Sequence, residues 1–434
     1  MVELRTAAWY GDRPLRLEFP SGWDVQVHWP ATPAPLAEPE IAAKLADPVE
    51  LPRLREFARG AVRPVVLVDD LTRPTPAARV FPELLRELAE AGVPAERVSI
   101  LLASGAHGRV PPDAIVKKVG AEAAASCRLL FHDPRGSTTR VGRTSLGTVV
   151  RVNPVAASSD LLLGIGGIYP QFTTGFGGGS KLALGALASS SIAALHYRHS
   201  SVDGSYAIEN DFRRDLDEIA RLVGLRWSLS MHVDAARQPV RVACGDHERY
   251  YADEVAFARH AFAAPLAGDA NVVIANAYPV DVSLTFARSK GVIPLLHAAP
   301  TASRVLIAAC PERVGLHTLF PFVHAPSLHR QRHLVRMVRY RPRTAAAQVI
   351  WRARAFAARG VAIGSPAPPA RRPISLFVPG GEPRSLPESI PDMKPLYTWA
   401  DVLERVSAEQ GRSRSLKVAI YPCAPLHVLD VRGL

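Results

Sequence analysis

The residues best suited to chemistry lie in one stretch of the sequence, residues 164–200. Its first half is rich in glycine and carries a single lysine, Lys181, and its second half is rich in Ala and Leu and carries His196 and His199. An amine with a depressed pKa is a nucleophile, and an imidazole is a common metal ligand. The order of strand, glycine loop, amine, helix and imidazole makes this stretch the first candidate for a functional site.

The glycine loop at residues 175–181 reads GFGGGSK and is similar to a phosphate-binding loop. It departs from the Walker pattern, because Ser180 precedes the lysine and Leu182 follows it. A glycine turn that leads into a helix can still hold a phosphate through backbone N–H groups. The loop residues that we consider for cofactor binding are Gly177, Gly178, Gly179 and Ser180. A tight turn with a solvated Lys181, or a buried Lys181 that acts as a nucleophile, explains the same residues.

The two histidines that follow the loop are three residues apart on an expected helix, so both can face one side of it. A His-x-x-His pair can bind a metal ion, although two ligands alone are too few to define a site. A single histidine on an Ala/Leu-rich helix is also commonly structural, which leaves both interpretations of His196 open.

Further candidates follow two expected strands upstream. Asp70, Thr72 and Arg73 come after the strand at 64–70, and His107 comes after the strand at 98–104. Arginine binds carboxylates through paired hydrogen bonds, and histidine titrates close to neutral pH and suits acid/base chemistry. The alternatives are an Asp70–Arg73 pair that holds its loop and a structural His107 in a glycine turn.

The elements that position these residues are expected to be alternating strands and helices. Buried strands are expected at residues 64–70, 98–104, 129–132 and 160–168. An amphipathic helix is expected over residues 77–92. This alternation is typical of an α/β fold with a mainly parallel, doubly wound sheet. Because loops after parallel strands share one edge of the sheet, Arg73, His107 and Lys181 should meet in one crevice.

The alternation restarts after a linker-like segment at residues 263–270. Strands are expected at residues 271–277, 303–309, 374–378 and 416–422, and helices at residues 283–298 and 398–410. We therefore predict two α/β domains, with the active site in the cleft between them. The predicted division is a cofactor-binding domain at 1–266, a second domain at 267–420 and a tail at 421–434.

The composition is that of a globular protein, with 48% hydrophobic and 21% charged residues. The formal net charge of +12 favours an anionic substrate. The Arg-rich run at 330–359 carries no nucleic-acid-binding signature, so a solvated helix face is expected and no nucleic-acid partner.

The four cysteines lie far apart, which favours a reduced, cytoplasmic protein over a zinc site. The first residues lack the pattern of a signal peptide. No apolar run approaches the roughly 18 residues of a membrane span, so we expect no membrane partner.

Taken together, these segments resemble the nickel-pincer lactate racemase family. The similarity rests on residues 70–74 (DLTRP), 104–107 (SGAH), 153–160, 175–181 and 190–196. A weaker similarity follows at 278–281 (YPVD), with Leu284 and Lys290. The similarity covers most of residues 60–200, and the order of the segments makes it specific.

The resemblance implies an isomerase that racemises or epimerises an α-hydroxy acid by hydride transfer to and from a nickel-pincer nucleotide. That cofactor is a pyridinium mononucleotide whose thioamide and thiocarboxylate arms hold nickel through one carbon and two sulfurs. The resemblance implies that Lys181 is the covalent tether and that His196 is the fourth ligand of a square-planar nickel. Asp70, Thr72 and the loop glycines would contact the cofactor, and cofactor-biosynthesis enzymes would be partners.

The resemblance also assigns roles toward a small-molecule substrate. Arg73 would bind the carboxylate, and Lys290, in the second domain, would also contact the substrate. His107 would take the α-hydroxyl proton while hydride leaves Cα.

One position departs from the family pattern. The family's second acid/base histidine follows the proline of a Pro-His turn, and the residue after Pro170 here is Gln171, which does not titrate. Another group, such as Tyr169, His132 or His199, would then serve the second face. Alternatively Gln171 hydrogen-bonds a different, larger hydroxy acid, or the protein binds a cofactor or ligand without racemising it. Independently of the resemblance, an α/β protein that binds an anionic nucleotide at the glycine loop remains a further hypothesis.

Overall fold

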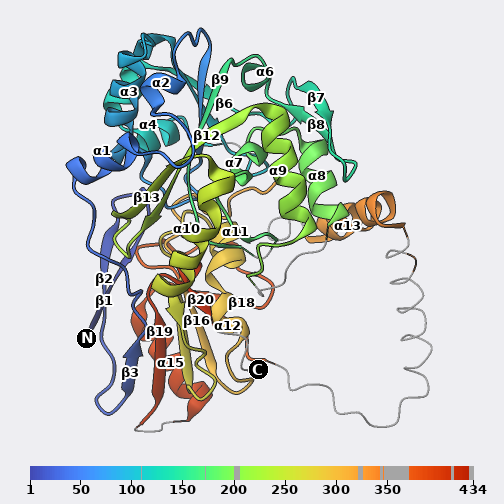
Figure 1. Ribbon diagram of the computed structural model, residues 1–434. Helices are drawn as coiled ribbons and strands as arrows, with labels where there is room; N and C mark the ends of the chain where they lie inside the picture. Colours follow the sequence, from blue (N-terminus) through green and yellow to red (C-terminus); the bar gives the residue numbers. More distant parts are fainter. Residues whose placement is uncertain are drawn as a thin grey trace.

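The structure is a computed structural model that describes residues 1–108, 110–171, 173–199, 206–320, 326–342, 346, 371–411 and 415–429. Parts of the Arg-rich run, at 343–345 and 347–359, lie outside the described residues, and so do 430–434 of the expected tail. Figure 1 shows two α/β units, each a sheet with its helices. One is built around strands β9 and β12 and the other around β16 and β19.

The first sheet is mainly parallel. Its strands run in the order β13 (Pro239–Gly245), β12 (Leu225–Val233), β9 (Leu161–Gly167), β4 (Pro64–Asp69), β5 (Ser99–Ala103) and β6 (Arg128–Phe131). Only the β12–β13 pair among these neighbours is antiparallel. The strands β9, β4 and β5 are adjacent, so the loops that follow them leave from the same edge.

Strand β4 shows why this sheet is covered on both faces. All six of its residues are buried, and successive side chains enter different cores. Val66 and Val68 belong to the core that contains Leu84 and Leu88 of α3 (Phe81–Glu90), whereas Val65 and Leu67 belong to the core on the other face. Continuous Val/Leu runs are typical of parallel strands that are buried on both sides.

Helices therefore cover both faces of the first sheet. One core includes residues of α1 (Glu38–Ala46), α2 (Leu54–Phe57), α3, α4 (Ala114–Val119) and α5 (Ala121–Ser126). The other core includes residues of α6 (Pro154–Ala157), α7 (Lys181–Leu184), α8 (Ser189–Arg198) and α9 (Asp211–Val223). A further helix, α10 (His247–Ala261), contacts β12 and β13.

The second sheet is parallel throughout its described pairs. Its strands run in the order β18 (Met393–Leu396), β17 (Ile374–Phe377), β16 (Ser303–Ile307), β15 (Val272–Asn276), β19 (Lys417–Tyr421) and β3 (Asp24–Val27). Its helical elements include α11 (Leu284–Phe286), α12 (Ile293–Leu296) and α15 (Trp399–Gln410). Helix α13 (Pro326–Tyr340) packs near α8 of the first unit.

The remaining described strands form short pairs. They are β1 (Val2–Thr6) with β2 (Arg13–Leu17), β7 (Thr139–Arg143) with β8 (Val149–Val152), β10 (Pro170–Gln171) with β11 (Gly175–Phe176), and β14 (Ala263–Ala264) with β20 (Val428–Leu429).

The expected α/β fold with mainly parallel sheets is confirmed, and the division at residue 266 stays a proposal. Strand β3 comes from the N-terminal range but adds an edge to the second sheet by pairing with β19. Asp281 of the second range also accepts hydrogen bonds from the backbone of Ala7 and Ala8, at 2.7 and 3.0 Å. The N-terminal residues therefore join both halves of the molecule.

The expectation of one helix over residues 283–298 is wrong. The segment is divided into α11, a π-helical turn η3 (Ala287–Gly291) and α12. Pro294 has no N–H to continue a helical ladder, and Gly291 lies so close to β15 that an added Cβ would be 2.7 Å from Ala277 Cβ. The expected helix over residues 77–92 is likewise split, into a short 3-10 turn η1 (Ala77–Arg79) and α3.

Within the described residues, none of the helices combines the length and the apolar character that a membrane span requires.

Gly185 sets the distance between the helix that carries Lys181 and the end of β5. An added Cβ would lie 2.4 Å from the carbonyl oxygen of Ala103, and Gly185 O accepts a 2.9 Å hydrogen bond from Gly105 N. We expect Gly185→Ala to lower the free energy of unfolding by about 1–3 kcal/mol, because backbone would have to move. Urea denaturation measures the difference.

Gly268→Ala is the matched control, since nothing lies within 4 Å of a Cβ at that position. Its change should stay below about 0.5 kcal/mol. Equal urea midpoints for the two variants would contradict the close approach at Gly185.

Candidate active site

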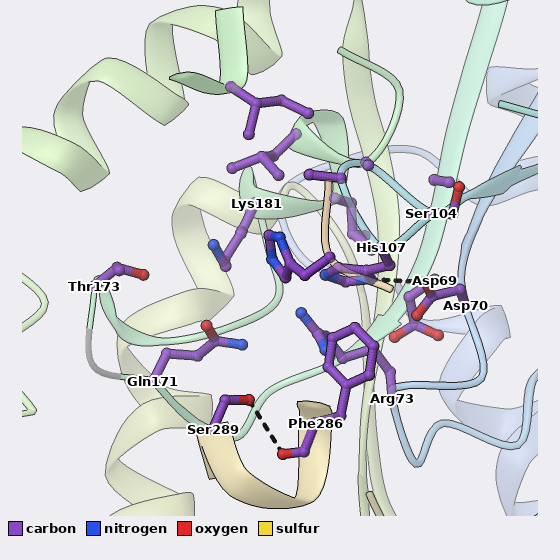
Figure 2. A pocket seen from close by; sticks show the side chains of 18 of the residues that line it. Asp69, Asp70, Arg73, Ser104, His107, Gln171, Thr173, Lys181, Phe286 and Ser289 are labelled. Carbon is purple, nitrogen blue, oxygen red and sulfur yellow. Dashed lines mark hydrogen bonds and ion pairs between the residues drawn. The ribbon is translucent and has the colours of Figure 1, made fainter. Parts of the chain in front are cut away.

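A cleft between the two sheets gathers the chemical groups of the molecule. Its walls come from the loops after β4, β5 and β9, from α7 and α8, and from residues after β15 and β16. Figure 2 shows Arg73, His107, Gln171, Lys181 and Phe286 around one cavity. The carboxyl edges of parallel strands thus meet at this cleft, as expected for ligand sites in open α/β sheets.

The loops after β4 and β5 are joined by Asp70 and His107. Asp70 Oδ2 lies 2.7 Å from His107 Nδ1, and Oδ1 accepts hydrogen bonds from the backbone N and Oγ1 of Thr72 at 3.1 and 2.5 Å. Asp70 is 1% exposed, so its carboxylate is held by these partners rather than by water. The alternative of an Asp70–Arg73 pair that holds the loop is not supported, because the hydrogen bonds of this carboxylate are with His107 and Thr72.

The charge states of this pair follow from burial and from its partners. Burial disfavours the charge on Asp70, but His107, Arg73 and the bond from Thr72 together hold its pKa well below the usual range. Burial lowers the pKa of His107, and Asp70 only partly opposes this. A neutral His107 then donates Nδ1–H to Asp70, which leaves Nε2 as a proton acceptor.

Arg73 extends from the same loop into the cavity (Figure 2). Its Nη1 donates to the carbonyl oxygen and Oγ1 of Thr72, at 3.1 and 2.8 Å, and its guanidinium carbon lies 5.6 Å from the centre of the Tyr169 ring. These contacts fix one side of the guanidinium. A positioned guanidinium of this kind suits a carboxylate.

Lys118, which the sequence analysis did not single out, supports the loop that carries Asp70 and Arg73. Lys118 on α4 is fully buried, and its Nζ donates to the carbonyl oxygens of Asp70 and Arg73 at 3.1 and 3.0 Å. It also forms a 2.6 Å ion pair with Asp69 Oδ1. Lys118 therefore positions the loop without facing the cleft.

Lys181 opens α7 and reaches the cleft from the opposite wall. Burial lowers the pKa of its amine to about 7, and the nearby charges of Arg73 and Arg213 add to the effect. The Nζ lies 5.6 Å from the centre of the Phe212 ring. A large share of neutral amine at neutral pH is what a nucleophilic lysine needs.

His196 lies on α8 and lines the same cleft. Its Nδ1 lies 2.8 Å from the carbonyl oxygen of Ile192, which requires the proton on Nδ1 and leaves the lone pair of Nε2 free. Burial, followed by the charge of Lys181, lowers the pKa of this imidazole to about 3. A neutral imidazole whose other nitrogen is held by a carbonyl is the usual form of a histidine metal ligand.

The residues of the glycine loop divide between the cleft and the scaffold. Gly178 lines the cleft, whereas Gly177, Gly179 and Ser180 are not among its lining residues. Ser180 Oγ donates to Asp217 Oδ1, and a Cβ at Gly179 would meet Arg213 and Tyr251 at 3.1 Å. Thr72 contacts the cleft only through His107 and Arg73.

Gln171 presents an unused donor to the cleft. The residue is 6% exposed, and its Nε2 is buried with no hydrogen-bond partner among the described residues. A buried unpaired amide is costly, so a ligand oxygen at this position would be stabilising.

The second sheet contributes its own cation and an aromatic side chain. Phe286, Ser289 and Lys290 line the cleft from α11 and the π-helical turn, and the role of Lys290 toward a substrate stays a prediction. Burial and the charges of Arg73 and Lys181 hold the pKa of Lys290 well below its ordinary value. Arg73, Lys181 and Lys290 therefore lie near one another in the cleft. The nearby carboxylates of Asp69 and Asp70 are already paired with Lys118 and His107.

His317 also lines the cleft, and the sequence analysis missed it. It lies in the loop after β16, where no periodic pattern or family segment marks it. Its ring centre is 5.5 Å from that of His107.

Two histidines that the sequence analysis offered for the second face lie elsewhere. His132 Nε2 is 2.9 Å from the carbonyl oxygen of Leu187, and His199 Nε2 is 2.7 Å from Asp215 Oδ2. His199 follows the end of α8 at Arg198, so the His-x-x-His pair on one helical face that the spacing allowed does not form. Neither residue lines the cleft, whereas Tyr169 does.

No group of three or more His, Cys, Asp or Glu side chains in the described ranges is arranged to hold a metal ion. A metal beside His196 would therefore need ligands from a bound molecule.

The fold and the site together define an α/β protein whose inter-sheet cleft collects an amine, imidazoles and a guanidinium. The lactate racemase N-terminal domain matches residues 10–207 of the chain. A lactate racemase from Thermoanaerobacterium thermosaccharolyticum is 28% identical over 291 residues, which are 64% of this chain and 68% of the relative. A lactate racemase from Lactiplantibacillus plantarum is 28% identical over 259 residues, or 57% of this chain and 61% of the relative.

Solved structures share the fold over nearly the whole chain. The lactate racemase apoprotein from T. thermosaccharolyticum matches with a TM-score of 0.69 and 20% identity, and covers 99% of this chain and 100% of its own. A protein from Thermotoga maritima matches with a TM-score of 0.56 and 14% identity, and covers 92% and 99%. The chain is thus similar in sequence to the lactate racemase N-terminal domain over residues 10–207, and similar in fold to a lactate racemase apoprotein over nearly its whole length.

Replacement of Lys118 tests the support of the Asp70–Arg73 loop. Lys118→Met would leave Asp69 buried without its cation, so we expect the free energy of unfolding to fall by about 3–5 kcal/mol. Lys117→Met, on the same helix, removes a 2.8 Å pair with the exposed Asp113 and a contact of Nζ with the Tyr10 ring at 3.7 Å, and should cost less than about 2 kcal/mol. Chemical denaturation of both variants measures the free energy of unfolding. Equal losses of stability would contradict the support that Lys118 gives to the Asp70–Arg73 loop.

The amine of Lys181 should react at a lower pH than other lysines. Because its pKa lies near 7, the neutral form dominates above pH 7, and acetylation of this residue should rise with a midpoint close to that pH. Lys417, whose pKa is raised by Asp269, serves as the internal control and should remain protonated. Peptide mass spectrometry after brief labelling gives both profiles, and a Lys181 midpoint above about pH 9 would contradict the effect of burial.

Proposed function

We propose that the chain racemises or epimerises an α-hydroxy acid, and that it does so with a nickel-pincer nucleotide attached to Lys181. The similarity to the lactate racemase N-terminal domain supports an isomerase, and the two curated relatives are named lactate racemases. The observation that carries the proposal is the pairing, in one cleft, of a buried amine whose pKa is lowered to about 7 with an imidazole whose Nε2 is free.

The residues of the cleft fit such a cofactor. Lys181 has the neutral amine that a covalent attachment requires, and His196 has the tautomer of a metal ligand. The orphaned amide of Gln171 and the backbone of Gly178 face the same space. When bound, the nucleotide would supply a hydride acceptor and donor, which none of the protein's side chains is.

The protein's own residues would bind and orient the substrate. Arg73 and Lys290 reach the cleft from different sheets and would hold a carboxylate between them. Such a carboxylate would relieve the repulsion that lowers the pKa of Lys290. The ring of Phe286 lies 4.8 Å from the centre of the His107 ring and would shield the reacting carbon from water.

His107 would accept the proton of the α-hydroxyl. Its Nε2 is the free acceptor, because Nδ1–H is held by the buried carboxylate of Asp70. The same carboxylate would stabilise the imidazolium that forms, which is the arrangement of an oriented general base.

Gln171 favours a second candidate function. A glutamine cannot exchange protons in the way of a histidine, so a homologue that binds the cofactor or an α-hydroxy acid without inverting it is the alternative. The unpaired Nε2 of Gln171 would then serve to bind the ligand.

The proposal also covers the partners of the protein and its location in the cell. Loading of the cofactor would need the enzymes that make it, which are the expected partners. A cytoplasmic location agrees with the four free cysteines, Cys127, Cys244, Cys310 and Cys423.

Turnover tests the proposal on protein co-expressed with the cofactor-making enzymes. Single enantiomers of a panel of α-hydroxy acids are incubated with it, and inversion is followed by chiral chromatography. We expect inversion of at least one acid, and a loss of about 10²–10⁴-fold in kcat/KM for His107→Asn. The exposed His260 provides the control variant, His260→Asn, which should keep full activity.

Full activity of His107→Asn would contradict the assignment of the base. A cofactor-loaded protein that binds acids of the panel but inverts none of them would favour the binding homologue.

A further inference from the structure

We propose that His317 is the second proton-exchanging residue of the cleft, and that it faces the substrate oxygen from the second sheet while His107 faces it from the first. This inference rests on the proposed function. It supplies a titratable group to a site in which Gln171 occupies the position of the family's second histidine.

The loop that carries His317 is tied to both halves of the molecule. On one side, Thr285 N donates to Val314 O at 2.9 Å, and Thr285 Oγ1 donates to Gly315 O at 3.2 Å. On the other side, the backbone N and Oγ1 of Thr318 donate to Ala106 O at 2.8 and 3.0 Å. His317 is thus held between two anchors, one of which is the residue before His107.

The two histidine loops also touch directly. Gly108 has a φ of +87°, and an added Cβ would lie 2.9 Å from both the Cβ and the carbonyl oxygen of Leu316. Glycine is needed here for the backbone conformation as well as for the close approach. The neighbours of both imidazoles are therefore in contact, which fixes the separation of the two rings.

A row of aromatic rings places His317 between the proposed base and the proposed metal ligand. Its ring centre lies 5.5 Å from that of His107 and 5.2 Å from that of Phe320. The ring of Phe320 in turn lies 5.4 Å from His196. Because the substrate must reach both the base and the cofactor, it would lie beside this row.

In their neutral forms, the two imidazoles carry their protons on different ring nitrogens. The backbone N of Phe320 donates to His317 Nδ1 at 3.1 Å, so the neutral ring carries its proton on Nε2. His107 is held the other way, with Nδ1–H on Asp70 and a bare Nε2. One ring is ready to accept a proton and the other is ready to donate one.

Inversion of the α-carbon needs one group that accepts the hydroxyl proton and one group that donates a proton to the oxygen. His107 Nε2 would take the hydroxyl proton, and the electron pair of the Cα–H bond would leave with its hydrogen as hydride, for which the bound nucleotide would supply the acceptor, as a C=O bond forms. On return of hydride to the opposite face of the carbon, His317 Nε2–H would give its proton to the oxygen, and the imidazolate that this leaves would take the proton held by the His107 imidazolium. Reaction of the other enantiomer would follow the same steps in reverse.

His317 is suited to this role as a neutral group. Burial, followed by the charges of His107, His196, Arg73 and Lys290, holds its pKa well below the ordinary value for histidine. A neutral imidazole can donate to an oxygen that develops negative charge, as it does in triosephosphate isomerase.

The other groups offered for this role are less well placed. His132 and His199 are bonded outside the cleft. Tyr169 lines the cleft, but phenols ordinarily titrate near pH 10, and its ring lies against Arg73.

A measurement that does not depend on turnover comes first. Histidine labelled with ¹⁵N is incorporated into the cofactor-loaded protein, and the imidazole signals are assigned with His317→Asn and His107→Asn. The ligand is 2-hydroxy-2-methylpropanoate, which has the carboxylate and hydroxyl of a substrate but no hydrogen on Cα to lose as hydride. Its binding should shift the Nε2 signals of both His317 and His107 and leave that of His260 in place. A shift at His107 alone would overturn the proposal.

Kinetics of the loaded protein then separate proton exchange from mere support of the loop. His317→Asn should lower kcat/KM for racemisation by about 10²–10⁴-fold in both directions. In a single turnover it should still form the 2-oxo acid from the enantiomer that His107 deprotonates, because only the second proton transfer is lost. Thr318→Val, which removes the side-chain anchor but keeps the imidazole, is the matched control and should lose far less.

The outcomes distinguish this inference from the function on which it rests. Recovery of racemisation when Gln171→His is added to His317→Asn would support it. Full racemisation by His317→Asn, in a protein whose wild type is active, would overturn the role of His317 alone. A loaded wild type that inverts none of the acids would instead refute the proposed function.

Discussion

A 2.7 Å contact between Asp70 Oδ2 and His107 Nδ1 joins the loops that follow two neighbouring strands of the first sheet. The contact needs a carboxylate that stays ionised although it is 1% exposed, and that condition is met by hydrogen bonds from Thr72 and the nearby charge of Arg73. Lys118 fixes the same loop through two carbonyl oxygens and Asp69. The direction in which His107 points, and hence the atom that can accept a proton, depends on this buried arrangement.

The electrostatics of the cleft point to an anionic ligand. Arg73, Lys181 and Lys290 face one another, and burial with mutual repulsion lowers the pKa of both lysines. Asp69 and Asp70 are paired with Lys118 and His107, and their charges also act on Arg73. A carboxylate therefore gains from the same charges that destabilise the protonated lysines. The lowered pKa of Lys181 follows mainly from burial, to which the charges of Arg73 and Arg213 add.

Much of this arrangement could be predicted from the sequence because it depends on local pattern. The Val/Leu run of β4 and the similar runs of β5 and β9 predict parallel strands, and the shared edge of such strands predicts that Arg73, His107 and Lys181 meet. The order of the family segments pointed to His196 and Lys290, and both residues line the cleft.

What the sequence did not predict depends on tertiary contacts. Lys118 resembles an ordinary helix lysine until α4 is packed under the Asp70 loop. His317 lies in a segment without periodicity, and only its anchors to Thr285 and Ala106 bring it to the cleft. The π-helical turn that ends at Gly291 likewise packs closely against Ala277, just after β15, and no local pattern predicts that contact.

The central claim is that Lys181 and His196 hold one nickel nucleotide between them. Intact mass spectrometry with metal analysis, on protein co-expressed with the cofactor-making enzymes, tests this most directly. We predict one covalent adduct on Lys181 with stoichiometric nickel, no adduct in Lys181→Arg, and an adduct that has lost its nickel in His196→Ala. A wild-type protein of unmodified mass without nickel would contradict the claim.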